Sequence, residues 1–261
     1  MCSSDLTAVA LGIDYTADPL WKGSARLELR DASTSRSIFS TLGLASKLNS
    51  DWTFLGRNAL AITRNIGSAS SERVQNRLQA GLAWRDTATD VWTGLGRIEH
   101  RTERDDTQPT QLISRTTELL SLNANYQPSK ATIVTGRYAG KWVRDNSNGL
   151  SSRDSAHLIG VRATRDIAER WDLGVIANSL FSGDGRSRQL GLGVEGGYLL
   201  GTNLWLSAGY NLFGFTDKDL AGADYTNRGV FLRLRVKFDE ALFSARETAA
   251  AVTAAAPEAR R

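Results

Sequence analysis

The sequence has few of the residues from which most enzyme and metal sites are built. Its 261 residues include one cysteine, one methionine and two histidines. The single cysteine, Cys2, excludes an internal disulfide, a CxxC pair and a cysteine-based metal site, because each of these needs at least two thiols. We therefore expect neither a metal nor a cofactor in this protein.

Proline, long apolar runs and clustered charge are also scarce. There are four prolines, and no segment approaches the roughly 20 apolar residues that a membrane-spanning helix needs. The 32 basic and 28 acidic residues give a net charge of +4 and are scattered, so we expect no nucleic-acid surface. Residues 1–6 lack the pattern of an export signal and are predicted to be the disordered start of a truncated chain.

The sequence does show a hydrophobic pattern that repeats every two residues. About thirteen segments of roughly 10 to 15 residues alternate apolar with polar or small residues, as strands do. In the clearest of them, an apolar set alternates with a set rich in charge: Val230, Leu232, Leu234, Val236 and Phe238 against Phe231, Arg233, Arg235 and Lys237. Alternation indicates an all-β fold, but a soluble sheet with one wet face would show it too.

The spacing of the connections favours a membrane barrel. Short links at residues 50–51, 87–90, 128–130, 168–170 and 201–202 alternate with long polar links, notably at 101–114, 145–155 and 216–227. Tight turns at one end of a sheet and longer loops at the other are typical of outer-membrane barrels. The acidic residues of the last link could bind a cation weakly, although a solvated loop is the stronger interpretation.

Aromatic residues gather beside the short links. The predicted membrane-interface aromatics are Tyr15, Trp21, Trp52, Trp84, Trp92, Tyr126, Trp171 and Tyr198, with Trp205 in a similar place. Amphipathic rings are stable at the level of the lipid headgroups, where outer-membrane barrels carry aromatic girdles. The alternative is that these rings cap the core of a soluble sheet.

A repeat supports an array of hairpins. The pattern W-x-G-x-x-R-x-E-x-R occurs at residues 21–30 and again at 92–101. Repeats can also indicate a β-propeller, but propeller strands are usually shorter and lack the difference between turns and loops. An up-and-down sheet is therefore the better prediction.

The strand faces opposite the apolar ones carry most of the charge. If the apolar faces meet lipid, the predicted lumen-lining residues are Arg26, Glu28, Arg30, Arg57, Arg97, Glu99, Arg101, Arg137, Lys141, Arg162, Arg233, Arg235 and Lys237. They could make an anion-favouring pore, or they could form Arg–Glu ladders that fill a narrow barrel, and we favour the ladders. Because both histidines, His100 and His157, fall on the apolar side, we expect no enzymatic activity.

The C-terminal segment LSAGYNLFGFTDKDLAGADYTNRGVFLRLRVKFDE resembles the closing hairpin of the barrel regions of Gram-negative outer-membrane and surface proteins. The resemblance implies an antiparallel up-and-down transmembrane β-barrel over residues 7–238, set in the lipopolysaccharide-bearing outer membrane. It also implies that Phe238 is the signal read by the barrel-assembly machinery. Residues 239–261 form an Ala-rich, low-complexity tail and depart from the pattern, because such barrels usually end at the aromatic.

The number of strands decides whether the barrel can close. Single-chain bacterial barrels have even strand numbers, so twelve or fourteen strands are expected, with thirteen leaving an open edge. The leading function is a membrane anchor for a longer surface or periplasmic protein. A porin-like passive channel with a basic lumen and a soluble all-β binding module are the alternatives, and a monomer is expected.

Overall fold

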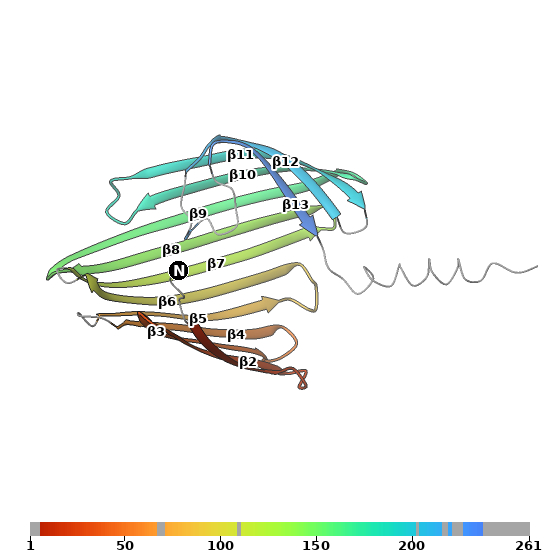
Figure 1. Ribbon diagram of the computed structural model, residues 1–261. Helices are drawn as coiled ribbons and strands as arrows, with labels where there is room; N and C mark the ends of the chain where they lie inside the picture. Colours follow the sequence, from red (N-terminus) through yellow and green to blue (C-terminus); the bar gives the residue numbers. More distant parts are fainter. Residues whose placement is uncertain are drawn as a thin grey trace, which may run out of the picture.

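The computed structural model describes residues 6–66, 71–108, 111–201, 204–215, 219–220 and 227–236. Within them thirteen antiparallel strands form one sheet, and each strand pairs with the next in sequence (Figure 1). The strands are β1 (Leu6–Tyr15), β2 (Trp21–Ala32), β3 (Ser35–Lys47), β4 (Trp52–Asn65), β5 (Ser71–Arg85), β6 (Trp92–Gln108), β7 (Gln111–Ser129), β8 (Thr132–Ser147), β9 (Leu150–Ala168), β10 (Trp171–Ser182), β11 (Arg188–Gly201), β12 (Leu204–Phe213) and β13 (Gly229–Val236).

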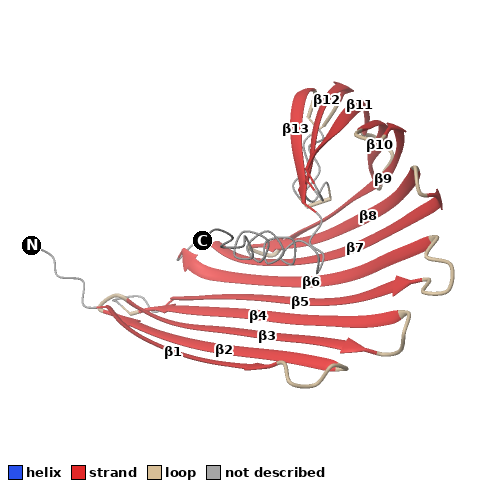
Figure 2. Cartoon of the chain, turned by 90° about the vertical axis from the view of Figure 1, so that its right-hand side faces the viewer, coloured by secondary structure: helices blue, strands red, loops and turns tan. Residues whose placement is uncertain are grey.

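The sheet curves strongly from β1 to β13, as Figure 2 shows. The predicted all-β, up-and-down architecture is confirmed, and thirteen strands lie within the predicted range of twelve to fourteen. Thirteen is nevertheless an odd number, and single-chain bacterial barrels have even numbers of strands. The pairings among the described residues include none between β1 and β13, so both are edge strands of the described sheet.

The two faces of the sheet differ as the alternation predicts. The outer, convex face carries exposed aliphatic side chains along the whole sheet, such as Leu11 at 65%, Val175 at 56% and Leu232 at 73% exposure. The inner, concave face carries many of the charged residues and most of the buried ones, among them Glu99 and Glu195. Exposed apolar side chains on every strand would be unstable in water, whereas hydrocarbon lipid accommodates them.

Two of the predicted long loops are strands. β6 runs to Gln108 and β7 begins at Gln111, while β8 and β9 are joined by residues 148–149 alone. The prediction of long links at 101–114 and 145–155 was therefore wrong. Both faces of these strand extensions are largely polar, so the alternating apolar pattern that identifies a half-buried strand is missing, although the backbone ladders continue.

The turn between β8 and β9 could have been found in the sequence. Asn148 and Gly149 both have positive φ, 50° and 82°. An Asn-Gly pair is the typical sequence of a two-residue hairpin turn, because that turn needs positive φ at both central residues. The dipeptide therefore identifies a tight hairpin where the polar composition indicates a loop.

The connection between β12 and β13, residues 214–228, is the longest one that joins two described strands. Its residues Phe215 and Leu220 pack against Ala139 of β8 and Leu158 of β9, and all four are buried. Phe215 and Leu220 therefore lie over the inner face of the sheet. Within the described residues no helix has the length and apolar content needed to cross a membrane.

Candidate functional site

The inner face brings most of the predicted lumen-lining residues together. The strand registers place Arg57, Gln79, Glu99, Leu119 and Lys141 in one row that crosses β4 to β8. The other predicted residues of this face with described side chains are Arg26, Glu28, Arg30, Arg97, Arg101, Arg137, Arg162 and Arg233. Arg235 pairs with Trp205 in the register, while Lys237 and Phe238 lie outside the described residues.

Glu99 is the centre of one ion-pair network. Its side chain is fully buried, and Arg77 donates two hydrogen bonds to its two carboxylate oxygens, at 2.6 and 3.1 Å. Gln79 donates a third at 2.6 Å, and Arg101 contacts the same carboxylate. Arg77 and Gln79 were not among the predicted residues, although the parity of β5 places both on the charged face.

Glu195 is the centre of a second network, on β11. Arg162 of β9 hydrogen-bonds its Oε1, and Arg233 of β13 approaches its Oε2 at 3.4 Å. The carboxylate lies over Gly174 of β10, where a side chain would leave no room for it. A buried acid held by two arginines links three strands, β9, β11 and β13, in the ladder arrangement that the sequence favoured.

The two copies of the repeat differ in their ion pairs. In the first, Glu28 accepts hydrogen bonds from Arg26 at 3.2 Å and from Arg30 at 2.6 Å. In the second, Glu99 contacts Arg101 but has no bond from Arg97 among the described residues. The charge of Arg97 is therefore not neutralised by Glu99.

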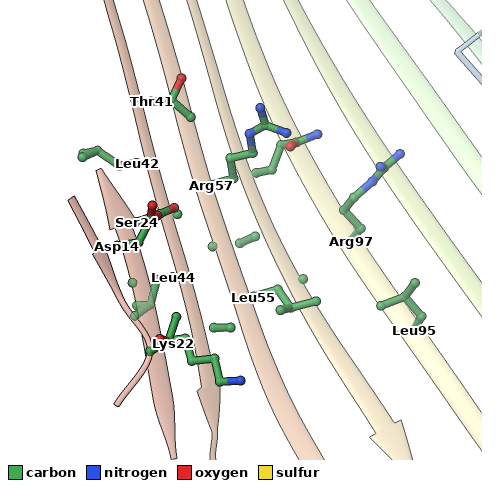
Figure 3. A pocket seen from close by; sticks show the side chains of 18 residues that line it. Asp14, Lys22, Ser24, Thr41, Leu42, Leu44, Leu55, Arg57, Leu95 and Arg97 are labelled. Carbon is green, nitrogen blue, oxygen red and sulfur yellow. The ribbon is translucent and has the colours of Figure 1, made fainter. Parts of the chain in front are cut away.

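Arg57 and Arg97 line one cavity of the inner face. It has a volume of about 640 Å³ and lies over β1 to β6, with Asp14 and Lys22 also on its wall. Figure 3 shows Arg57 and Arg97 reaching the same side of this cavity from β4 and β6. Within the described part of the chain no carboxylate lies within ion-pair distance of either guanidinium.

The β12–β13 connection adds an acid to the inner face. Asp219 accepts a hydrogen bond from Lys141 at 2.5 Å and one from Arg101 at 3.1 Å. Arg137 donates to the backbone carbonyl of Leu220 at 3.1 Å. Although burial acts to raise the pKa of Asp219, the bonds from Lys141 and Arg101 outweigh it and hold that pKa below its usual value.

The acidic residues of the 216–227 link, which the sequence offers as a weak cation site, are only partly described. Asp219 is committed to side-chain cations, while Asp217 and Asp224 lie outside the described residues. Among the described residues there is no group of three or more histidine, cysteine, aspartate or glutamate side chains placed to hold a metal.

The eight predicted interface aromatics form four pairs on the outer face. Each pair lies beside a link at the same end of the sheet, such as residues 48–51 or 86–91. The pairs and their ring-centroid distances are Tyr15 and Trp21 at 4.3 Å, Trp52 and Trp84 at 6.1 Å, Trp92 and Tyr126 at 4.4 Å, and Trp171 and Tyr198 at 4.8 Å. Trp205 has the parity of the inner face, because it pairs with Arg235 in the same register as Ser207 with Arg233.

A second aromatic group lies toward the opposite end of the outer face. His157 Nδ1 and the hydroxyl of Tyr138 share a hydrogen bond of 2.9 Å. The His157 ring also packs against Trp142 and Phe181. Phe181 follows Trp171 by ten residues on β10, about 33 Å along a strand, or ~25 Å in height at a tilt of about 40°. The two aromatic groups are thus about one apolar band apart.

Both histidines lie on this outer face. His100 Nδ1 contacts a carboxylate oxygen of Glu118 at 2.6 Å, and His157 belongs to the aromatic group. The carboxylates of the inner face are on the other side of the sheet from them.

Solved structures with this fold are outer-membrane β-barrels. The chain is similar to the siderophore receptor PirA from Pseudomonas aeruginosa (TM-score 0.68, 9% identity), covering 90% of this chain and 50% of that one. It is also similar to the RagAB peptide transporter (TM-score 0.62, 9% identity, 90% and 40%) and to the ferric preacinetobactin receptor BauA from Acinetobacter baumannii (TM-score 0.52, 11% identity, 90% and 51%).

The chain therefore spans about half the length of these structures or less. No protein-family model matches the sequence, and a comparison with curated proteins finds no match. The likeness establishes the fold, that of an outer-membrane β-barrel wall, and agrees with the predicted location in the outer membrane.

Proposed function

We propose that this chain forms the wall of an outer-membrane β-barrel whose basic inner face lets small anionic solutes pass. The proposal corresponds to the porin-like channel considered from the sequence. A wall that conducts must also be closed, since a sheet edge in lipid leaves backbone groups without partners. The proposal therefore includes further strands that pair with the edges of β1 and β13.

Arg57 and Arg97 carry the proposal. Most inner-face charges are neutralised within the chain, by Glu28, Glu99 and Glu195. These two arginines instead border a cavity of about 640 Å³ without a carboxylate partner in the described residues. Rings of unpaired cations along a pore attract anions and repel cations, which sets ion selectivity.

Two of the similar structures are a siderophore receptor and a peptide transporter. Identities of 9% transfer no substrate to this chain. The shared fold with a receptor and a transporter nevertheless supports passage of a solute over a purely structural role. The proposal contains no catalytic step, in line with the prediction that the protein is not an enzyme.

The test is ion selectivity of the full-length protein in planar lipid bilayers. In a KCl gradient the reversal potential should show preference for chloride, and the double variant Arg57→Gln/Arg97→Gln should lose much of it. The matched control, Arg36→Gln/Arg64→Gln, also removes two charges, but from the outer face, and should keep the preference. Cation preference in the unaltered protein would refute the proposal.

Anchoring of a longer surface or periplasmic protein remains the second candidate. It is favoured by the side of the inner face near β8 to β13, where Glu195 is held by two arginines and Leu158 is buried under Leu220. A wall filled in this way is suited to stability rather than passage. A membrane-embedded protein that shows no conductance in any bilayer would favour the anchor over the channel.

Assembly follows from either function. We propose that the barrel-assembly machinery inserts the chain, with Phe238 as the recognised residue, and that the inserted protein is a monomer. Deleting residues 237–261 or replacing Phe238 by alanine should reduce the amount of protein in the outer membrane. Insertion of the Phe238→Ala variant at the normal level would remove Phe238 from this role.

A further inference from the structure

Asp219 joins three distant parts of the chain on the inner face. It belongs to the β12–β13 connection, and it bonds Arg101 on β6 and Lys141 on β8, which are 118 and 78 residues away. Each cation contacts a different oxygen of the carboxylate, Oδ1 for Arg101 and Oδ2 for Lys141. The two side chains are therefore arranged as a clamp for one carboxylate group.

The clamp borders its own cavity. This cavity has a volume of about 370 Å³, and its wall includes Arg101, Thr117 and Lys141 together with Asp219. The strand registers fix the spacing, because Thr117 lies opposite Arg101 on one side and Val143 on the other. A volume in this range, about 300–1,000 Å³, is that of small-molecule sites.

The other charges around this cavity are already matched. Glu103 accepts a 2.6 Å hydrogen bond from Arg73, and Arg115 donates one of 2.5 Å to Asp145. Among the described residues, Asp219 is the one carboxylate within ion-pair distance of Lys141. If Asp219 leaves the clamp, Lys141 loses this partner and Arg101 keeps only Glu99.

We propose that Arg101 and Lys141 form a carboxylate-binding site, which Asp219 occupies in this structure and which the carboxylate of a small anionic solute takes in its place. Asp219 shows the chemistry of the ligand, since any carboxylate of similar reach can accept the same two charge-assisted hydrogen bonds. Access of a solute rests on the proposed channel function. The site itself rests on the contacts of Arg101, Lys141 and Asp219.

The test is calorimetric titration of the full-length, detergent-solubilised protein with succinate. The variant Asp219→Asn should bind succinate about tenfold more tightly than the unaltered protein, because the internal carboxylate no longer competes. Adding Lys141→Gln to that variant should remove most of the gain. Asp219→Ala serves as a second form of the variant, and the heat-dependent shift in gel mobility checks that each variant is folded.

Asp184→Asn is the matched control, because it makes the same chemical change in the β10–β11 connection, where Asp184 pairs with Arg186. It should leave the affinity for succinate unchanged. The site is refuted if Asp219→Asn and Asp219→Ala bind succinate no more tightly than the unaltered protein, or if Lys141→Gln has no effect in either background.

Calorimetry needs no ion current, so the two proposals can fail separately. Binding that follows these expectations in a protein without anion current would overturn the channel and leave the site. An anion current that depends on Arg57 and Arg97, in a protein where the Asp219 variants do not change succinate binding, would overturn the site and leave the channel.

Discussion

Replacing Glu99 by glutamine should destabilise the protein more than any equivalent change at an exposed ion pair. The Glu99 carboxylate is fully buried and accepts bonds from Arg77, Gln79 and Arg101. Glutamine keeps one acceptor oxygen and places an amide group, which is itself a donor, against guanidinium donors. At least two of the charge-assisted hydrogen bonds are then lost.

The size of the effect follows from these contacts. A hydrogen bond to a charged group contributes about 1.5–3 kcal/mol, so two would give roughly 3–6 kcal/mol. Arg77 is about half exposed and Arg101 about one-third exposed, so water can solvate part of the charge that is left. We therefore expect a loss of about 2–4 kcal/mol in the free energy of unfolding.

The assay is urea unfolding of the protein folded into phospholipid vesicles, followed by tryptophan fluorescence. Glu72→Gln is the control, because Arg64 donates two hydrogen bonds to that carboxylate at 3.1 and 2.6 Å while the pair remains exposed. It should cost no more than about 1 kcal/mol. Equal losses for Glu99→Gln and Glu72→Gln would refute the claim that burial makes Glu99 the centre of a network.

Two further predictions concern the outer face and the β12–β13 connection. Trp171→Ala should lower the free energy of unfolding from vesicles by about 1–3 kcal/mol, since it removes the ring that packs on Tyr198, and an unchanged value would contradict an interfacial role. Because the pKa of Asp219 is held below its usual 3.8, the stabilisation from this carboxylate is present above that value and is lost as pH falls through the lowered pKa. The stability difference between the unaltered protein and Asp219→Asn should therefore stay constant from pH 7 to 5 and shrink only below pH 3.8; shrinkage already at pH 5 would contradict it.

The sequence predicts which residues share a face of the sheet better than it predicts where the strands end. A period of two predicts that Arg57, Glu99 and Lys141 share a face, and the strand registers align them in one row, because side-chain alternation in a strand depends only on position. The ends of β6 to β9 were missed, since strands with two polar faces have no apolar period. Asn148 and Gly149 were the local signal that a hairpin continues there.

The contacts of the site depend on register, which alternation does not fix. Nothing in the sequence near Glu99 indicates that Arg77 and not Arg97 is its main partner, because the choice follows from how β5 is aligned with β6. The same holds for Asp219, whose partners are 78 and 118 residues away. Such contacts follow from the register of the strands and from where the sheet brings distant segments together.

The central claim is that the outer face meets lipid and the inner face meets water. The chain has one cysteine, Cys2, so Cys2→Ser gives a background for single labels along β10. Spin labels at Leu173, Val175 and Ala177 should be relaxed by oxygen dissolved in lipid, and labels at Ile176 and Asn178 by a water-soluble nickel complex. Such an alternation with a period of two would support the account, whereas accessibility of all five positions to the nickel complex would contradict it.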